Sequence, residues 1–222
     1  MEPKLTILGK SGLRFFGKMS AANAHEIKNA LAVINENAGL LGDLAVMADK
    51  GRPLDPERLL KLSGKIKEQV SRADEIAKST NQFAHSVDNM HGTADLGKSL
   101  ALVKTMAMRF ATQRHISIEI KPMASSITLP MQQFMLLHLL WRCLRCAMET
   151  TNAEKTIQVE ISRSDHKTMV RFGSLSHLAG STVTAFSNSA ETHELLKLLN
   201  AEISADLQNG DLWLGFLKKS RG

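Results

Sequence analysis

The chain has 222 residues, of which 43% are hydrophobic and 23% are charged, values close to those of soluble globular proteins. They exclude a wholly disordered or fibrous chain, and the length allows one large domain or two small ones. No stretch of about 18 apolar residues is present, and the N-terminal residues lack the apolar core of a signal peptide, so we expect a cytoplasmic protein without a transmembrane helix. The net charge of +6 raises the question of nucleic acid. The basic residues are dispersed, however, and only 5% of the residues are aromatic, which argues against such a partner.

The first half of the chain, residues 1–90, predicts two long helices, the first beginning near Ser11 and ending at residues 50–53, where glycine and proline interrupt it. Asp55 and Pro56 have the residue types of an N-cap and a first helical position, which predicts the start of the second helix. In the first helix, apolar residues recur at alternating steps of four and three, as in a helical bundle or coiled coil. These positions are Ile27, Leu31, Ile34, Ala38, Leu41, Ala45 and Ala48. Because one hairpin leaves such a stripe half covered, we expect a homodimer that closes a four-helix bundle.

The second half, residues 91–222, predicts an alternation of helices and strands. Helices are expected at 95–113, 130–149 and 191–200, and strands at 115–120, 156–162, 168–172, 201–207 and 212–217. Residues 174–189 are rich in Ser, Gly, Ala and Thr and predict a loop, whereas Asn209 and Gly210 predict the turn of a final hairpin. This order of elements is typical of a two-layer α/β sandwich. The predicted fold class is therefore α+β, a helical hairpin followed by an α/β sandwich.

Three polar residues lie together on the outer side of the first predicted helix. At about 100° per residue, His25 and Asn29 lie within about 40° of each other and point away from the apolar stripe. An exposed imidazole can attack phosphorus, and the adjacent carboxylate of Glu26 can orient the ring or accept its proton. The amide of Asn29 can hydrogen-bond water or a phosphoryl oxygen. A lone helical histidine is more often a neutral structural residue, but this cluster makes His25, Glu26 and Asn29 candidate catalytic residues.

The segment 25–29, with the sequence HEIKN and followed by Leu31, resembles the phosphoacceptor box of the histidine kinases of two-component signalling. The dimerisation domain of that family is a hairpin of two long helices that forms a four-helix bundle, and the resemblance runs through about residues 13–88. It implies that His25 is the phosphorylated residue, that Glu26 is its acidic neighbour and that Asn29 places water when a response regulator is dephosphorylated. Ala30 departs from the family, which usually has proline there. Loss of this proline would remove a helix kink without removing chemistry.

The second half resembles the family's ATP-binding domain in the order of its elements, but the nucleotide motifs are missing. The resemblance places Arg142 and Cys146 where the family has two asparagines, the second of which holds Mg²⁺, and a thiol is a poor ligand for that ion. Residues 171–175 lack the aspartate that would bind adenine, and residues 187–191 lack the glycines that would wrap a phosphate. We therefore expect a degenerate ATPase-like domain that binds no ATP, no metal and no other cofactor, with Mg²⁺ supplied by a partner receiver domain.

These features predict a histidine phosphotransfer protein of two-component or phosphorelay signalling, which passes a phosphoryl group through His25 to or from a response-regulator aspartate. The expected partners are a second copy of the chain, a receiver domain and an upstream hybrid histidine kinase, with no nucleic acid and no membrane. The positive net charge would attract acidic receiver domains. Three alternatives stay open: a response-regulator phosphatase that uses Glu26 and Asn29, a non-catalytic regulator of a histidine kinase, and an active sensor kinase with divergent nucleotide contacts.

Other residues carry weaker signals. Cys143 and Cys146 have the spacing of a redox pair, but they fall within an apolar helical stretch and are interpreted as core residues. As the only two cysteines, they also cannot form a disulfide framework, which fits a reducing compartment. His85 and His91 could indicate a metal, yet no set of cysteines or carboxylates stands at ligand spacing, and both are interpreted as solvated. His138, on an apolar helix, is interpreted as a core histidine.

Overall fold

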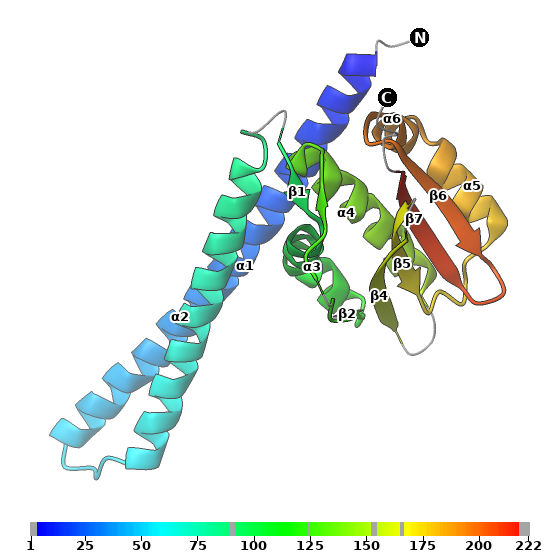
Figure 1. Ribbon diagram of the computed structural model, residues 1–222. Coiled ribbons are helices and arrows are strands. Elements are labelled where there is room, and N and C mark those ends of the chain that lie inside the picture. Colours follow the sequence, from blue (N-terminus) through cyan, green and yellow to red (C-terminus); the bar gives the residue numbers. More distant parts are fainter. Residues whose placement is uncertain (1–3, 89–91, 124, 152–154, 165–166, 218–222) are drawn as a thin grey trace. The chain divides into compact units, whose positions relative to one another are not determined.

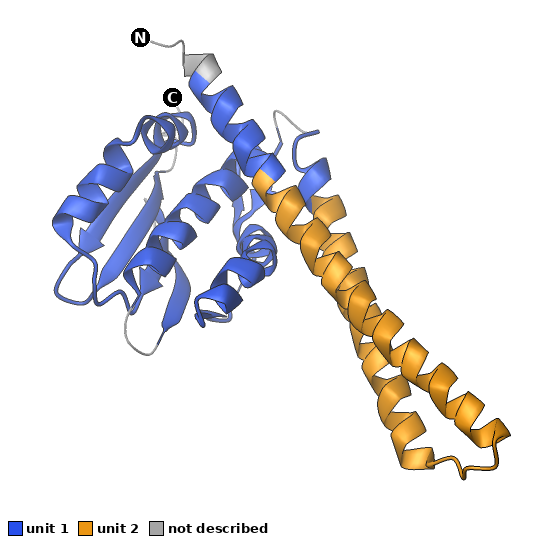
Figure 2. Cartoon of the chain, turned by 180° about the vertical axis from the view of Figure 1, so that it is seen from behind, with its two compact units in different colours: residues 1–17, 83–222 blue, residues 18–82 orange. Residues whose placement is uncertain are grey.

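The structure is a computed structural model that describes residues 4–88, 92–123, 125–151, 155–164 and 167–217. The chain forms two compact units (Figures 1 and 2). The first, here called the hairpin unit, comprises residues 18–82, and the second, the α/β unit, comprises residues 1–17 and 83–222. The chain thus passes between the units twice, after Gly17 and after Gln82, and the first turns of the N-terminal helix belong to the α/β unit.

Two long helices build the hairpin unit. α1 covers Lys4–Asp49, which begins earlier than the helix predicted from Ser11, and α2 covers Pro56–His85. The predicted N-cap of α2 is confirmed, because Oδ1 of Asp55 accepts two backbone N–H hydrogen bonds of 3.0 and 3.4 Å from the first turn. Gly51, with a φ of 81°, takes the left-handed conformation that reverses the chain between the helices.

The apolar stripe of α1 is divided between a buried and an exposed side. Four of the predicted positions are half-buried, namely Ile27, Ile34, Leu41 and Ala48. The other three, Leu31, Ala38 and Ala45, are exposed. The fully buried positions nearby are Ala30, Asn37 and Leu44. The packed face of α1 is therefore displaced from the predicted stripe, and a single chain covers that stripe only in part.

The length and composition of α1 bear on the expected location of the protein. By these criteria alone, α1 between Ile7 and Asp49 is long and apolar enough to cross a membrane. From the sequence, no such helix is expected, because the chain has no continuous apolar run of sufficient length. The mean hydropathy of a segment can be high even when polar residues are interspersed, so α1 passes that second criterion. Core helices of soluble proteins and signal sequences pass the same test. The cytoplasmic location therefore stays a prediction.

A mixed five-stranded sheet forms one layer of the α/β unit (Figure 1). Its strands in spatial order are β2 (Ser117–Ile120), β4 (Thr156–Arg163), β5 (Lys167–Gly173), β7 (Asp211–Leu217) and β6 (Ala201–Asp206). β2 pairs with β4 in parallel, and the other neighbours are antiparallel. Each of these strands lies within or close to its predicted range, and the turn of the final hairpin contains Gly210 with a φ of 65°.

The two faces of this sheet differ in polarity, as strand alternation requires. One face carries the buried core, where Val170 of β5 lies opposite Leu214 of β7. The other face carries ion pairs, among them Arg171 with Glu160 and with Asp211, each at 3.0 Å. Only one face therefore needs a cover of helices, which gives a two-layer sandwich. The predicted fold class, a helical hairpin followed by an α/β sandwich, is confirmed, and the four-helix bundle of a dimer stays a prediction.

Helices α3 (Leu96–Gln113), α4 (Gln133–Thr150) and α6 (Ala190–Leu198) correspond to predicted helices. α4 packs against β5 and β7, α3 packs against α4 and β2, and α6 packs against α4 and β6. The N-terminal turns of α1 join the same unit through aromatic side chains. The ring of Phe15 lies 5.6 Å from that of Phe134 and stacks on the imidazole of His138 at 4.7 Å.

The structure differs from the predicted elements of the α/β unit in two places. α5, at Gly180–Asn188, lies within the segment predicted as a loop. None of its residues is fully buried, so its sequence lacks the apolar stripe by which a helix is identified. β1 (Ala94–Asp95) and β3 (Thr128–Leu129) form a separate antiparallel pair that was not predicted, because two residues are too few to show a periodicity.

Candidate functional site

His25 lies on α1 within the hairpin unit, and half of its side chain is exposed. Asn29 follows one helical turn later, on the same side of the helix. Its Nδ2 atom lies 3.1 Å from Nδ1 of His25, a hydrogen-bond distance. The structure thus brings together the two residues that the spacing placed near each other.

Glu26 connects this pair to the second helix. Its Oε1 atom lies 3.4 Å from Nδ2 of Asn29 and 3.9 Å from Nδ1 of His25. Its Oε2 atom accepts a hydrogen bond of 2.6 Å from Nη2 of Arg72 on α2. The side chain of Glu26 is 19% exposed and that of Arg72 is 54% exposed, so the carboxylate is partly withdrawn from water while the guanidinium is not. All four residues belong to the hairpin unit.

Arg72 was not among the residues singled out from the sequence. It lies 46 positions after Glu26, on a helix whose many charges resemble an ordinary solvated face. Its contact with Glu26 depends on the register of the two antiparallel helices. Counting residues outward from the turn at Gly51 gives this register, and it could have predicted the contact of Arg72 with Glu26.

The contacts of Nδ1 determine what the His25 ring can do. A neutral imidazole has one protonated and one free nitrogen, and the partner of one nitrogen selects the state of the other. When Nδ1 carries the proton, it can donate to Oδ1 of Asn29 with the amide turned over, and the charge of the Glu26 carboxylate, whose Oε1 atom lies 3.9 Å from Nδ1, favours the proton there. Nε2 then keeps its lone pair and is the nucleophile. When Nδ1 instead accepts the amide N–H, the proton resides on Nε2, which is not nucleophilic.

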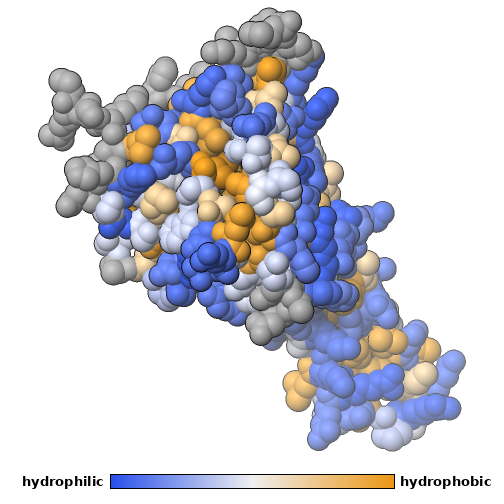
Figure 3. All heavy atoms as spheres, turned by 90° about the vertical axis from the view of Figure 1, so that its right-hand side faces the viewer, coloured by the Kyte–Doolittle hydropathy of each residue, from blue (hydrophilic) through white to orange (hydrophobic). Residues whose placement is uncertain are grey.

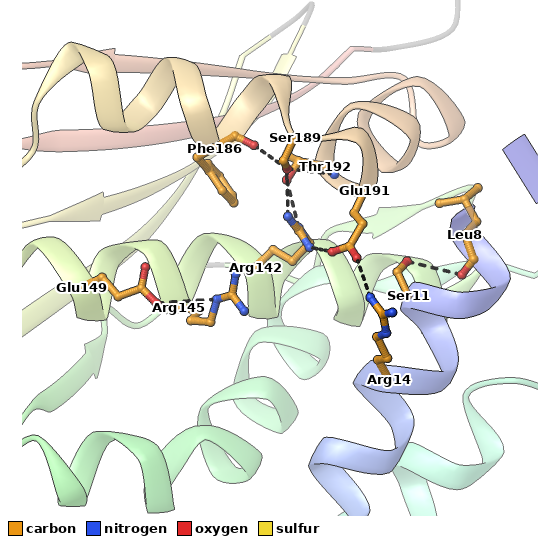
Figure 4. A network of polar contacts seen from close by, with 10 residues as sticks. All are labelled: Leu8, Ser11, Arg14, Arg142, Arg145, Glu149, Phe186, Ser189, Glu191 and Thr192. Carbon is orange, nitrogen blue, oxygen red and sulfur yellow. Dashed lines mark hydrogen bonds and ion pairs between the residues drawn. The ribbon is translucent and has the colours of Figure 1, made fainter. Parts of the chain in front are cut away.

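Arg142 lies on α4, at one of the positions where the resemblance places an asparagine (Figure 4). Its guanidinium is buried, is ion-paired with Glu191, and donates hydrogen bonds of 2.9 Å to the hydroxyls of Thr192 and Ser189. Glu191 also lies 3.8 Å from Arg14 of α1. Burial lowers the pKa of the Arg142 guanidinium, and the charge of Glu191 opposes this shift. The cation at this position is therefore already paired by groups of the protein.

A cavity of about 480 Å³ lies between α4 and α5 and is lined in part by Arg142, Arg145, Cys146, Glu149 and Phe186. Arg145 and Glu149 form an ion pair of 3.8 Å across its α4 side. Cys146 is 4% exposed, and burial raises the pKa of its thiol to about 11. A neutral thiol is not a ligand for Mg²⁺, which takes oxygen.

The other two expected nucleotide positions carry structural residues. After β5, Ser174 has a φ of 70° and Leu175 is buried, so a hydroxyl and an apolar side chain stand where a carboxylate would be needed. At residues 187–191, Ser189 is the N-cap of α6 and accepts a hydrogen bond from the backbone of Thr192. The donor set at these positions does not fit a magnesium nucleotide.

The remaining candidates are structural in character. Cys143 is completely buried, and neither it nor Cys146 takes part in a disulfide. His138 is 3% exposed, as expected of a core histidine. His85 lies 2.7 Å from Asp88, whereas His91 lies outside the described residues. Across the part of the chain that the structure describes, no three His, Cys, Asp or Glu side chains group as a metal site.

Comparisons with known proteins yield structural neighbours alone. No protein-family model and no curated protein matches the chain. Acinetobacter baumannii histidine kinase AdeS aligns with 10% identity and a TM-score of 0.49, over 88% of this chain and 98% of that one. A bacterial phosphotransferase aligns with 14% identity and a TM-score of 0.47, over 91% and 95%. The catalytic domain of histidine kinase ThkA aligns with 12% identity and a TM-score of 0.45, over 58% and 95%. Because these TM-scores lie below 0.5, the neighbours assign no function to this chain.

Proposed function

We propose that this chain is a histidine phosphotransfer protein of two-component or phosphorelay signalling. The supporting observation is the half-exposed His25 with Asn29 and Glu26 around its Nδ1 atom, in a chain whose Arg142 and Cys146 do not fit a magnesium nucleotide. Such a protein can receive a phosphoryl group on histidine but does not take it from ATP. We assign the phosphoacceptor role to residues 1–90, and we assign residues 91–222 as a degenerate ATPase-like domain.

In the proposed transfer, Nε2 of His25 attacks the phosphorus of an aspartyl phosphate on a receiver domain. The N–P bond forms while the P–O bond to the aspartate breaks, and the aspartate leaves as a carboxylate. The carboxylate charge of Glu26, 3.9 Å from Nδ1, favours the proton on that nitrogen and stabilises the positive charge that develops on the ring. Mg²⁺ bound by the receiver neutralises the phosphoryl oxygens, and transfer onward to a second receiver is the reverse of these steps.

Exposed apolar side chains on the hairpin unit support the proposed homodimer (Figure 3). They are Leu31, Val33, Leu40, Val46 and Met47 on α1 and Leu60 and Val70 on α2. Two amphipathic helices that leave so much apolar surface in water are stabilised when a second hairpin completes a four-helix bundle. The other proposed partners are a cytoplasmic receiver domain, whose acidic surface the net charge of +6 would attract, and an upstream hybrid kinase.

The test is a transfer assay with the full chain. Receiver domains encoded in the same genome are phosphorylated with labelled acetyl phosphate and mixed with the chain, and a parallel reaction contains labelled ATP alone. We expect label to reach the wild type from a receiver and to be absent from His25→Gln. His85→Gln, which changes another exposed histidine, serves as the control and should retain transfer. Labelling of His25 by ATP alone would overturn the proposal. It would also be overturned if the wild type transferred no phosphoryl group while both the wild type and His25→Gln bound the receiver.

A response-regulator phosphatase is the second candidate, and the contacts of Asn29 favour it. The amide lies between Nδ1 of His25 and Oε1 of Glu26, where it could place a water for attack on a receiver phosphate. In this case Asn29→Ala should retain phosphotransfer but slow receiver dephosphorylation at least tenfold. An unchanged dephosphorylation rate would reject the phosphatase and leave the phosphotransfer proposal intact.

A further inference from the structure

Arg72 holds one side of the Glu26 carboxylate. Nη2 of Arg72 donates to Oε2 of Glu26 at 2.6 Å, the short distance expected of a charge-assisted hydrogen bond. The two residues come from different helices of the hairpin unit, so the contact depends on how α1 and α2 pair. Glu26 is therefore oriented by the tertiary structure of the hairpin and not by its own helix alone.

The two oxygens of Glu26 have different surroundings. Oε2 contacts Arg72, while Oε1 faces Nδ2 of Asn29 at 3.4 Å and Nδ1 of His25 at 3.9 Å. A glutamate on a helix surface samples several rotamers, and anchoring one oxygen restricts where the other can lie. With Oε2 anchored, Oε1 stays on the side of the imidazole.

We propose that Arg72 is a positioning residue for His25, which acts through Glu26 to keep the imidazole proton on Nδ1. This inference rests on the proposed phosphotransfer function, because only a nucleophilic Nε2 makes the position of that proton important. Without the guanidinium, Glu26 is free to turn toward water. The attraction of the carboxylate for a proton on Nδ1, across the 3.9 Å to Oε1, is then weakened, and the amide N–H of Asn29, at 3.1 Å in either case, favours the tautomer with the proton on Nε2. Arg72 thus keeps the ring in its reactive form without touching it.

The chain offers matched variants for a test. Arg72→Gln removes the charge, and Arg72→Lys keeps a cation that can still donate the single N–H···O contact. Arg58→Gln is the control, because Arg58 is the other arginine of α2 and is also exposed. Glu26→Gln, alone and combined with Arg72→Gln, shows whether the arginine acts through the carboxylate.

The first measurement is the pair of ring ¹⁵N chemical shifts of His25, read from a long-range ¹H–¹⁵N spectrum of the full chain. His25→Gln identifies the signal among the eight histidines. We expect Arg72→Gln to move the His25 shifts toward the tautomer protonated on Nε2, while Arg72→Lys and Arg58→Gln leave them near those of the wild type. This readout needs no receiver, so it decides the role of Arg72 even if the wild type transfers no phosphate and the proposed function fails.

The second measurement is the initial rate of phosphoryl uptake by His25 from potassium phosphoramidate, a small donor that needs no protein partner. We expect Arg72→Gln to reduce this rate about tenfold, Arg72→Lys to retain at least one third of it, and Arg58→Gln to leave it unchanged. The double variant should be no slower than Glu26→Gln alone, because the arginine has no other route to the ring. The inference is overturned if the ring ¹⁵N shifts of His25 in Arg72→Gln equal those of the wild type. It is also overturned if Arg72→Gln lowers the rate of phosphoryl uptake by the same factor in the wild type and in the Glu26→Gln variant. Circular dichroism of each variant confirms that the hairpin is folded.

Discussion

The side-chain amide of Asn23 on α1 donates a hydrogen bond of 2.8 Å to the hydroxyl of Thr80 on α2. Asn23 is 5% exposed, and the same hydroxyl donates in turn to the backbone carbonyl of Ile76 at 2.7 Å. A partly buried polar pair of this kind costs little while both members are bonded, but a shifted register of the helices would separate them. The bond therefore favours the register that also brings Arg72 to Glu26.

We predict that Asn23→Ala destabilises the chain by about 1 kcal/mol, because it removes a partly buried hydrogen bond between the two helices. Alanine is itself the better helix former, so the control is Asn35→Ala, an exposed asparagine on the same helix. Urea unfolding followed by circular dichroism should show a loss for Asn23→Ala and a small gain for Asn35→Ala. Equal changes in the two variants would mean that the Thr80 contact does not contribute.

The local part of the candidate site could be predicted from the sequence, and the nonlocal part could not. His25, Glu26 and Asn29 lie within five consecutive residues, so helix geometry alone places them together. Arg72 and the Asn23–Thr80 bond depend on the pairing of helices, which the apolar stripe predicted imperfectly. The fully buried positions of α1, namely Ala30, Asn37 and Leu44, lie beside the predicted stripe, so the periodicity located the packed face only approximately.

The elements of the fold likewise divide into those that a local sequence pattern predicts and those that it does not. α4 is apolar over most of its length and β5 alternates clearly, so both were identified from the sequence. α5 was missed because most of its residues are small or polar, and Val183 and Phe186 alone are too few to mark one face. The pairing of Arg142 with Glu191 could not be predicted from the sequence either. The two residues are 49 positions apart, and the charge of Arg142 gives no indication that its side chain is buried.

We predict that Glu191→Gln destabilises the α/β unit, because Arg142 keeps its buried charge and loses its only carboxylate among the described contacts. The carboxylate side is partly exposed, so solvent screening reduces the loss to about 1–2 kcal/mol, below that of a fully buried pair. Trp141 and Trp213, the only tryptophans, both lie in this unit, so urea unfolding followed by their fluorescence measures it directly. Glu149→Gln, which breaks the exposed pair with Arg145, is the control and should change the midpoint little.

The burial of His138 predicts a loss of stability in acid. Burial, with smaller contributions from Arg142 and Arg145, lowers the pKa of its imidazole from 6.5 to about 3. Above pH 6.5 the ring is neutral in both states, so it has no effect. Below pH 6.5 the unfolded chain takes up a proton that the folded chain does not, and this group removes about 1.4 kcal/mol per pH unit down to about pH 3.

Unfolding by urea between pH 7.5 and pH 4.5 tests this linkage. His138→Met keeps an apolar side chain against Phe15 and has no group that titrates in this range, so its stability should fall less steeply with acid than that of the wild type. His85→Gln changes an exposed histidine and should keep the wild-type slope. Parallel curves for the wild type and His138→Met would show that the imidazole is protonated in the folded chain.

The two thiols should resist modification while the α/β unit is folded. Cys143 is completely buried and Cys146 is 4% exposed, and burial raises the pKa of both. The thiolate is the reactive form, so at pH 8 a thiol with a pKa of about 11 reacts about a hundredfold more slowly than one with a pKa of 9.0.

Reaction of the two thiols with a chromogenic disulfide should therefore be slow in the native chain and rapid in guanidinium chloride. Cys143→Ser should retain most of the slow native reaction, because Cys146 has the lower pKa and the greater exposure, and Cys146→Ser should remove it. Rapid formation of a disulfide between the two in the folded chain would instead support the redox pair that their spacing resembles, and would place both thiols at an accessible surface.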